Sequence, residues 1–298
     1  MVTIFLWSIG PLFVKYFSRF YNPWTQNAFR YSCAALALLG WMAWKRRPIF
    51  RLSGRQWKNL LLVTACNVCM QVFFAAAYYF IYPAVASLIH RVSILFVITL
   101  SFLVFHDERQ VIRSGRFLVG CVLTLAGALL VTLGQDPRLL ARLDVSQSAF
   151  WIGVGLALAY ALFLALYTVT IKHLVRDVPP LISFTHVSWT TALALVILML
   201  CMGGAPDLWR QPLKPLGIMV LSAVLCISVA HPALFAALRH VKAVVSSAMM
   251  QLLPVLTCTG SALLFGDRLS TLQILGGGLV ICGASLAAVA EARLKDEV

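Results

Sequence analysis

Arg91 is the most informative residue of this sequence, because its charge interrupts a long apolar run from Ala84 to Phe105. A charge at the centre of a bilayer costs roughly 2.5–3.5 kcal/mol on insertion scales, so such a residue normally faces a cavity or a partner. If a membrane helix begins at Ala84, a rise of about 1.5 Å per residue puts Arg91 and the neighbouring His90 about 10 Å below the membrane surface. We therefore predict that both residues line a polar cavity. The alternative is that Arg91 reaches outward to the headgroups or bonds helix carbonyls.

Four other polar or aromatic residues lie inside apolar runs at positions where they could line the same cavity. Asn67 and Gln71 are four residues apart, so they share one helix face and either point at the cavity or bond neighbouring helices. Trp189 shares a face with His186, three residues before it. For the histidines of these runs, His186 and His231, the favoured reading is a satisfied residue of the interior. Gln251 lies deep in another run. The predicted substrate-binding residues are Arg91, His90, Gln251, Asn67, Gln71 and Trp189.

Two basic residues and one proline have different expectations. Lys15 and Arg30 lie near the ends of the first two expected helices, where we expect them to extend to the headgroups; a gate at the outer mouth is the alternative. His231-Pro232 is expected to kink its helix, because proline has no backbone N–H.

The acidic residues are informative by their positions, since all of them lie in loops, at helix ends or in the tail. Proton-coupled carriers commonly use intramembrane carboxylates. If this chain transports a solute, transport is therefore expected to be facilitative, an exchange, or coupled through a histidine. The sequence contains no H-E-x-x-H, G-x-S-x-G or Walker lysine pattern. Its C-x-x-C, Cys66 to Cys69, has no second pair and no nearby histidines, so packing is the favoured reading. We predict no catalytic residues, no metal site and no cofactor.

The elements that hold these residues are predicted to be membrane helices. Of the 298 residues, 61% are hydrophobic and 11% charged, and the mean hydropathy is +0.90, which excludes a water-soluble domain. A bilayer core of roughly 30 Å needs about 20 apolar residues per helix. The fold class is therefore an all-α polytopic membrane protein with ten transmembrane helices, at 2–17, 28–44, 60–82, 84–105, 117–134, 149–171, 181–202, 215–238, 243–265 and 272–290.

The net charge of +14 is explained by the loops and does not indicate nucleic acid. Cytoplasmic loops of membrane proteins carry an excess of Lys and Arg. The loop 45–58 carries six of them without an acid, and the loops and tail on its side carry fifteen in total, against six on the other side. We predict a multi-pass protein of the inner or plasma membrane, surrounded by the lipid bilayer, with both termini in the cytoplasm.

The second half of the chain repeats the first. Residues 84–109 match residues 243–268 at an offset of 159, which pairs Arg91 with Met250, the residue before Gln251. Each matched segment ends in an acid-Arg pair, and the following helices share the pattern Gly-x6-Gly. The repeated unit has five helices, so the second copy enters the membrane inverted, as in many transporters. The predicted repeats are 1–140 and 145–298, with the polar cavity between the fourth and ninth helices and the third and eighth at its border.

These features resemble the EamA-type members of the drug/metabolite transporter superfamily over nearly the whole chain. The resemblance is carried by Leu6-Trp7-Ser8 with Lys15, Asn22-Pro23 with Arg30, Glu108-Arg109, Ala237 to Ala243, Pro254-Val255, and Phe265 to Arg268. The first half departs from the pattern at Leu95, which aligns with Pro254, and by a three-residue extension. The resemblance implies export or uptake of a small metabolite or drug. Together with the inverted halves, which suit alternating access, it leads us to predict a secondary transporter, favoured as an exporter, of a small metabolite, amino acid or drug.

Other functions remain as alternatives. A channel or a non-transporting membrane scaffold is the first of these, and an intramembrane enzyme is the least favoured. The substrate is expected to be anionic or amino-acid-like, because no acid in the apolar spans can neutralise Arg91. If helix ends or water stabilise the guanidinium instead, a zwitterion or a polar neutral solute would serve.

Overall fold

The computed structural model describes residues 1–17, 19–46, 52–77, 79–81, 83–135, 148–202, 213–265 and 269–296. Every regular element in these residues is a helix, in agreement with the all-α class predicted from the sequence. Each expected apolar run contains helix, but three runs hold more than one element, namely 84–105, 215–238 and 243–265. The predicted boundary between the repeats, 140–145, lies outside the described residues.

The chain forms two compact units, and each unit draws on both halves of the sequence. The first unit comprises residues 1–71 and 170–239, and the second comprises 72–169 and 240–298. Two long helices, α3 (Gly54–Ala77) and α8 (Ser148–Leu174), contribute to both units. The units are described separately below.

The first unit is built around the pair α2 and α9, which pack against each other. Its other elements are α1 (Val2–Phe17), α11 (Leu213–Ala223), η3 (Val224–Val229) and α12 (Ala230–Ala237), besides α2 (Pro23–Trp44) and α9 (Pro180–Cys201). Both helices of the pair have a proline in the first turn, where its missing N–H costs no helix bond. The Asn22 side chain caps α2 by accepting a hydrogen bond from the Thr25 N–H at 2.8 Å.

Corresponding small and apolar residues are buried on the two helices of this pair. They are Ala35, Leu38 and Met42 on α2, and Ala192, Leu195 and Met199 on α9. The two sets have the same spacing along their helices, which is the spacing of one helix face.

The segment η3 is π-helical and directly precedes Ala230-His231-Pro232. Pro232 has no N–H, so the carbonyl of Ser228 lacks its usual helix partner, and the hydrogen-bonding pattern changes before the proline. The expected disturbance at His231-Pro232 therefore takes the form of a π-helical turn. Such turns occur frequently at functional sites.

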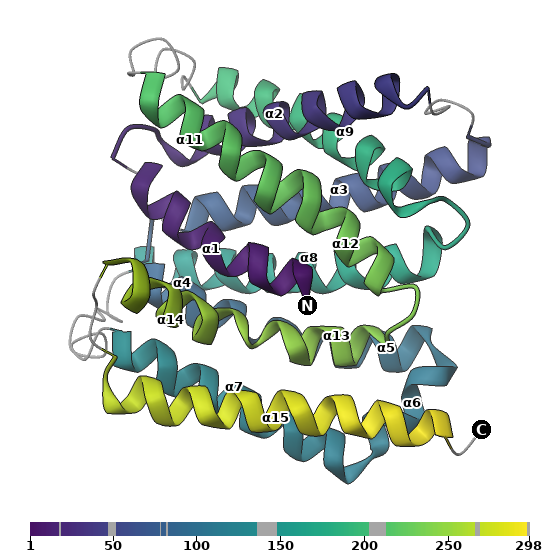
Figure 1. Ribbon diagram of the computed structural model, residues 1–298, viewed down its shortest axis with the longest axis vertical. Helices are drawn as coiled ribbons and strands as arrows, with labels where there is room; N and C mark the ends of the chain where they lie inside the picture. Colours follow the sequence, from purple (N-terminus) through teal and green to yellow (C-terminus); the bar gives the residue numbers. More distant parts are fainter. Residues whose placement is uncertain are drawn as a thin grey trace. The chain divides into compact units, whose positions relative to one another are not determined.

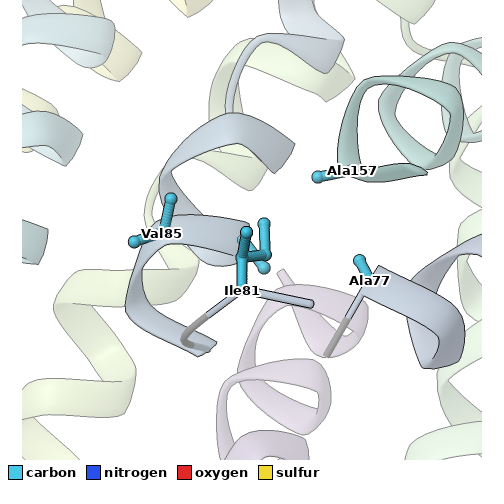
Figure 2. Close-up of a cluster of buried hydrophobic side chains, with 5 residues drawn as sticks. Ala77, Ile81, Val85 and Ala157 are labelled. Atoms are coloured by element: carbon cyan, nitrogen blue, oxygen red, sulfur yellow. The ribbon is translucent and has the colours of Figure 1, made fainter. Parts of the chain in front are cut away.

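The second unit contains two interrupted helices and one closely packed helix pair. Its elements are α4 (Pro83–His90), α5 (Ser93–Val104), the 3₁₀ turn η1 (His106–Glu108), α6 (Arg109–Arg113), α7 (Gly115–Gln135), α13 (Ala243–Met250), α14 (Leu253–Phe265) and α15 (Thr271–Asp296). The short connection before α4 is packed by a small apolar cluster, in which Ala77, Ile81 and Val85 gather with Ala157 of α8 (Figure 2). Because α3 ends at Ala77 and α4 begins at Pro83, the expected runs 60–82 and 84–105 do not form a single long helix.

The two Gly-x6-Gly patterns lie face to face in the pair α7 and α15, which run side by side (Figure 1). A Cβ atom on Gly120 would lie 2.7 Å from the Gly283 carbonyl oxygen, and one on Gly127 would lie 2.5 Å from that of Gly276. The earlier glycine of each helix thus meets the later glycine of the other, so the two helices are antiparallel. Only glycine allows this approach, as in the small-residue interfaces of membrane helices.

Seven described helices are long and apolar enough to cross a membrane, judged by length and composition. They are Gly54–Ala77, Gly115–Gly134, Ser148–Leu174, Pro180–Cys201, Pro215–Ala237, Ala243–Gly260 and Thr271–Arg293; Val2–Val14 and Leu88–Val104 are shorter apolar stretches. Large apolar side chains are exposed on their surfaces, for example Val122 on α7 and Ile274 on α15, as expected of helices that face lipid. The number of ten spans stays a prediction.

Candidate functional site

Two helices of the second unit are broken at corresponding positions. Arg91-Val92 separates α4 from α5, and Gln251-Leu252 separates α13 from α14. At each break the backbone N–H groups bond carbonyls three residues earlier, such as Arg91 N to Leu88 O and Gln251 N to Ala248 O, both at 3.1 Å. The helix bounds correspond at an offset of 160, from Pro83 to Ala243, so Arg91 corresponds to Gln251. The sequence offset of 159 paired Arg91 with Met250, one residue away.

The breaks bring Arg91 and Gln251 together. The Gln251 Nε2 donates a hydrogen bond to the Arg91 carbonyl oxygen at 3.4 Å. The Gln251 side chain is only 2% exposed, and its Oε1 has no hydrogen-bond partner among the described residues. A broken helix presents backbone and side-chain polar groups inside a membrane protein, which is how many transporters bind solutes and ions.

His90, at the end of α4, lies in an aromatic cluster beside this break. Its ring centroid is 3.9 Å from that of Tyr160 and 5.6 Å from that of Phe74. His90 is buried, and its Nε2 has no hydrogen-bond partner within the described part of the chain. Arg91 is half-buried and lies close enough to His90 and Tyr160 to act on both electrostatically. The second unit therefore combines a cation, a buried imidazole and a buried amide at two helix ends.

Asn67 and Gln71 share a helix face in the first unit and take part in one hydrogen-bond network. The Tyr31 hydroxyl donates to the Asn67 Oδ1 at 3.3 Å and accepts from the Gln71 Nε2 at 2.9 Å. The Asn67 Nδ2 donates to the Thr191 Oγ1 at 3.0 Å. The network joins α3 to α2 and α9, and Asn67 is fully buried within it.

Trp189 also lies in the first unit, on α9. Its Nε1 donates a hydrogen bond to the Nδ1 of His186 at 3.3 Å, as their spacing of three residues allows. The His186 ring is buried and also contacts Trp57, with ring centroids 4.6 Å apart. The six predicted site residues thus fall into two groups, Arg91, His90 and Gln251 in the second unit, and Asn67, Gln71 and Trp189 in the first.

Arg30 was not among the predicted site residues, and the expectation that it extends to the headgroups was wrong. It is 8% exposed and lies on the buried face of α2. The sequence signal was present, because Gln26 and Asn27 lie one turn before Arg30 and share that face, while Leu36 and Trp41 are exposed. The side chain of Lys15 lies outside the described residues.

Glu108, the acid of the Glu108-Arg109 pair found in the sequence, caps a helix in the structure. It is fully buried, and its two carboxylate oxygens accept hydrogen bonds from the N–H groups of Ala243 at 2.7 Å and Val244 at 3.1 Å. The Glu291 carboxylate accepts from the Lys242 N–H at 3.1 Å. Two carboxylates therefore cap the positive end of α13, whose first N–H groups have no partners within the helix. Sequence reasoning did not predict this contact, and the other pair, Asp267-Arg268, lies outside the described residues.

Long apolar helices, apolar surfaces and polar groups collected at breaks inside the helices define a polytopic membrane protein. The chain belongs to the EamA-like transporter family, whose sequence pattern matches residues 1–133 and 151–289. This confirms the resemblance seen in the sequence.

Comparisons with other proteins add support for the fold. This chain is similar in structure to a protein whose crystal structure is known, with a TM-score of 0.80 and 15% sequence identity. The similarity covers 98% of this chain and 96% of the other protein. At that identity the similarity shows the fold alone. No curated protein matches the sequence.

Proposed function

We propose that the protein is a secondary transporter that exports a small metabolite, an amino acid or a drug across the inner or plasma membrane by alternating access. The observation that carries this proposal is the pair of corresponding helix breaks at Arg91-Val92 and Gln251-Leu252. Membership of a transporter family gives the general function. Discontinuous helices in corresponding positions of two halves are the feature by which binding regions of secondary transporters are recognised.

The proposal includes ten transmembrane helices in two inverted repeats, with both termini in the cytoplasm. The pairs α2 with α9 and α7 with α15 support it, since each joins the corresponding helices of the two halves. The antiparallel approach of α7 and α15 is what an inverted repeat requires. The excess of Lys and Arg on one side supports the orientation.

The proposed substrate-binding residues of the second unit are Arg91, His90 and Gln251. The Gln251 amide oxygen and the His90 Nε2 have no hydrogen-bond partner among the described residues, so each can bond a polar solute without breaking a hydrogen bond to one of them. Asn67, Gln71 and Trp189 are proposed to act in the first unit, with Asn67 and Gln71 positioned by Tyr31.

The test is uptake of radiolabelled amino acids and organic acids into proteoliposomes that contain the purified protein. A transporter gives uptake that saturates with solute concentration, whereas a channel gives conductance without saturation in this range and a scaffold or an enzyme gives neither. Gln251→Ala is expected to raise the half-saturating concentration, and Gln110→Ala, at an exposed position, is the matched control. Unsaturable flux, or no flux for any solute, would contradict the proposal.

A further inference from the structure

Helix α2 is arranged with its polar face inward. Thr25, Gln26, Asn27 and Arg30 are all buried, whereas Leu36, Trp41 and Trp44 are exposed. A membrane helix turns apolar side chains to the lipid, and polar or charged side chains within its span normally face the protein interior or a cavity. The first unit therefore has a polar interior at the start of α2, and Arg30 is its charged member.

The Arg30 guanidinium is incompletely satisfied by the described residues. Its Nε is buried and has no hydrogen-bond partner among them. Its neighbours are the Cys226 thiol, Tyr31 and the His231 ring, and none of these is an acid. Burying a charge without a counter-ion costs free energy. A buried Arg is therefore expected where another group, such as a bound ligand, supplies the negative charge.

The first unit contains almost no acidic residue that could supply the negative charge for Arg30. Residues 1–106 contain neither Asp nor Glu, and residues 170–239 contain only Asp177 and Asp207. Asp177 is exposed in the turn between α8 and α9, and Asp207 lies outside the described residues. The described part of this unit thus holds a buried cation and no buried carboxylate.

Two neighbours of Arg30, Cys226 and His231, are held in place by contacts with other residues. Cys226 belongs to the π-helical segment, where its carbonyl accepts a hydrogen bond from the Trp7 Nε1 at 3.0 Å. The His231 ring stacks on Phe184 with centroids 4.6 Å apart and meets the Trp7 ring edge-on at 4.9 Å. These contacts hold Cys226 and His231 in place without using the Arg30 Nε.

From these observations we propose that Arg30 binds a carboxylate group of the transported solute, in a site formed by α2, η3 and α12. The planar guanidinium matches a carboxylate through two parallel N–H bonds. The Nε, which has no partner among the described residues, is one of the donors used in that geometry. The inference rests on the proposed transport function, since it names the class of solute. Arg91 interacts with other described residues, so we infer no unpaired charge there. The inference is made for Arg30, whose Nε has no hydrogen-bond partner among the described residues and whose neighbours include no acid.

The test measures ligand binding through the thermal unfolding temperature of the purified full-length protein in detergent. The probes are L-leucine, L-phenylalanine, L-glutamate, lactate and succinate, each compared with its primary amide. At least one carboxylate is expected to raise the unfolding temperature more than its amide. Arg30→Met is expected to weaken that binding by about 10- to 100-fold, the loss typical of hydrogen bonds to a charged group, and Arg30→Lys is expected to retain part of it.

The unliganded protein gives a second measurement that a purely structural role of Arg30 would not satisfy. If Arg30 serves the ligand, Arg30→Met replaces an expensive buried charge by an apolar side chain, and the unliganded protein is at least as stable as the wild type. Arg116→Met, at an exposed position of α7, removes the same charge and is the matched control. An unliganded Arg30→Met that is less stable and binds the carboxylate with unchanged affinity would overturn the proposal, and so would the absence of any preference for a carboxylate over its amide.

Failure of this inference can be told from failure of the proposed function. If a carboxylate binds through Arg30 but proteoliposomes show no saturable uptake, the anion site stands and transport fails. If uptake saturates but carboxylates and amides bind alike, transport stands and the anion site fails.

Discussion

Replacing Gly127 with alanine places a methyl group inside the contact between α7 and α15. The added Cβ would lie 2.5 Å from the Gly276 carbonyl oxygen and 2.7 Å from the Val280 backbone nitrogen. Both neighbours are backbone atoms of a helix, so neither can turn aside as a side chain would. Ordinary van der Waals contact of a Cβ begins at 3.4 Å, so the two helices must separate by almost an ångström.

The cost of that separation follows from packing and propensity together. Overpacking a close contact typically costs about 1–3 kcal/mol, while alanine in place of glycine in a helix gains up to about 1 kcal/mol. Gly278→Ala isolates the second contribution, because a Cβ there would have no neighbour within 4 Å. We expect Gly127→Ala to be less stable than Gly278→Ala by about 1–3 kcal/mol, the full packing cost.

The assay is the thermal unfolding temperature of each variant in one detergent. The double variant Gly127→Ala/Gly276→Ala adds a further test, because one separation of the helices relieves both clashes and the two losses should be less than additive. Equal unfolding temperatures for Gly127→Ala and Gly278→Ala would refute the close approach of these helices.

Three further predictions follow from the sequence and the cap of α13. Glu108→Gln should destabilise the protein by about 1–2 kcal/mol, because the carboxylate that caps α13 is lost. Hydrogen exchange of the amides in the first turn of α13 should become faster. Asp107→Asn, at an exposed position, should change neither the stability nor the exchange. Reporter tags after Gln135 and after Val298 should label opposite sides of the membrane, and labelling of one side by both would exclude the five-plus-five topology. Solute-driven uptake should continue after the proton gradient is collapsed, and strict dependence on that gradient in variants lacking His90, His186 and His231 would contradict the expectation.

The apolar runs were enough to predict where the helices lie, because hydropathy and length are properties of local sequence. The breaks inside them were not predicted. Pro254 offered a signal in the second half, since it lacks the N–H that would bond the Met250 carbonyl. In the first half, Leu95 holds the place aligned by sequence and Ile94 the place that corresponds by the helix bounds. Neither is a proline, so the interruption at Arg91-Val92 has no comparable cause in the local sequence.

The burial of polar residues was harder to predict than the position of helices. The depth of a residue in the membrane can be predicted from its distance along the helix, and Arg91 was predicted in this way to lie well inside the membrane. Whether a residue faces inward depends on what packs against that face, and Arg30 was therefore misjudged from its place near a helix end. Glu108 shows the same limit, since its partners at Ala243 and Val244 are 135 and 136 residues away in the sequence.

The contacts within the units connect the two halves of the sequence at corresponding places. Gly127 meets Gly276, α2 packs on α9, and Gln251 bonds the carbonyl of Arg91. Glu108 of the first half caps a helix of the second. A first half alone would leave the glycine face of α7 without a partner and the Glu108 carboxylate without the N–H groups that accompany its burial. The halves of the proposed repeat are therefore units of sequence, whereas the packing described here forms only when both are present.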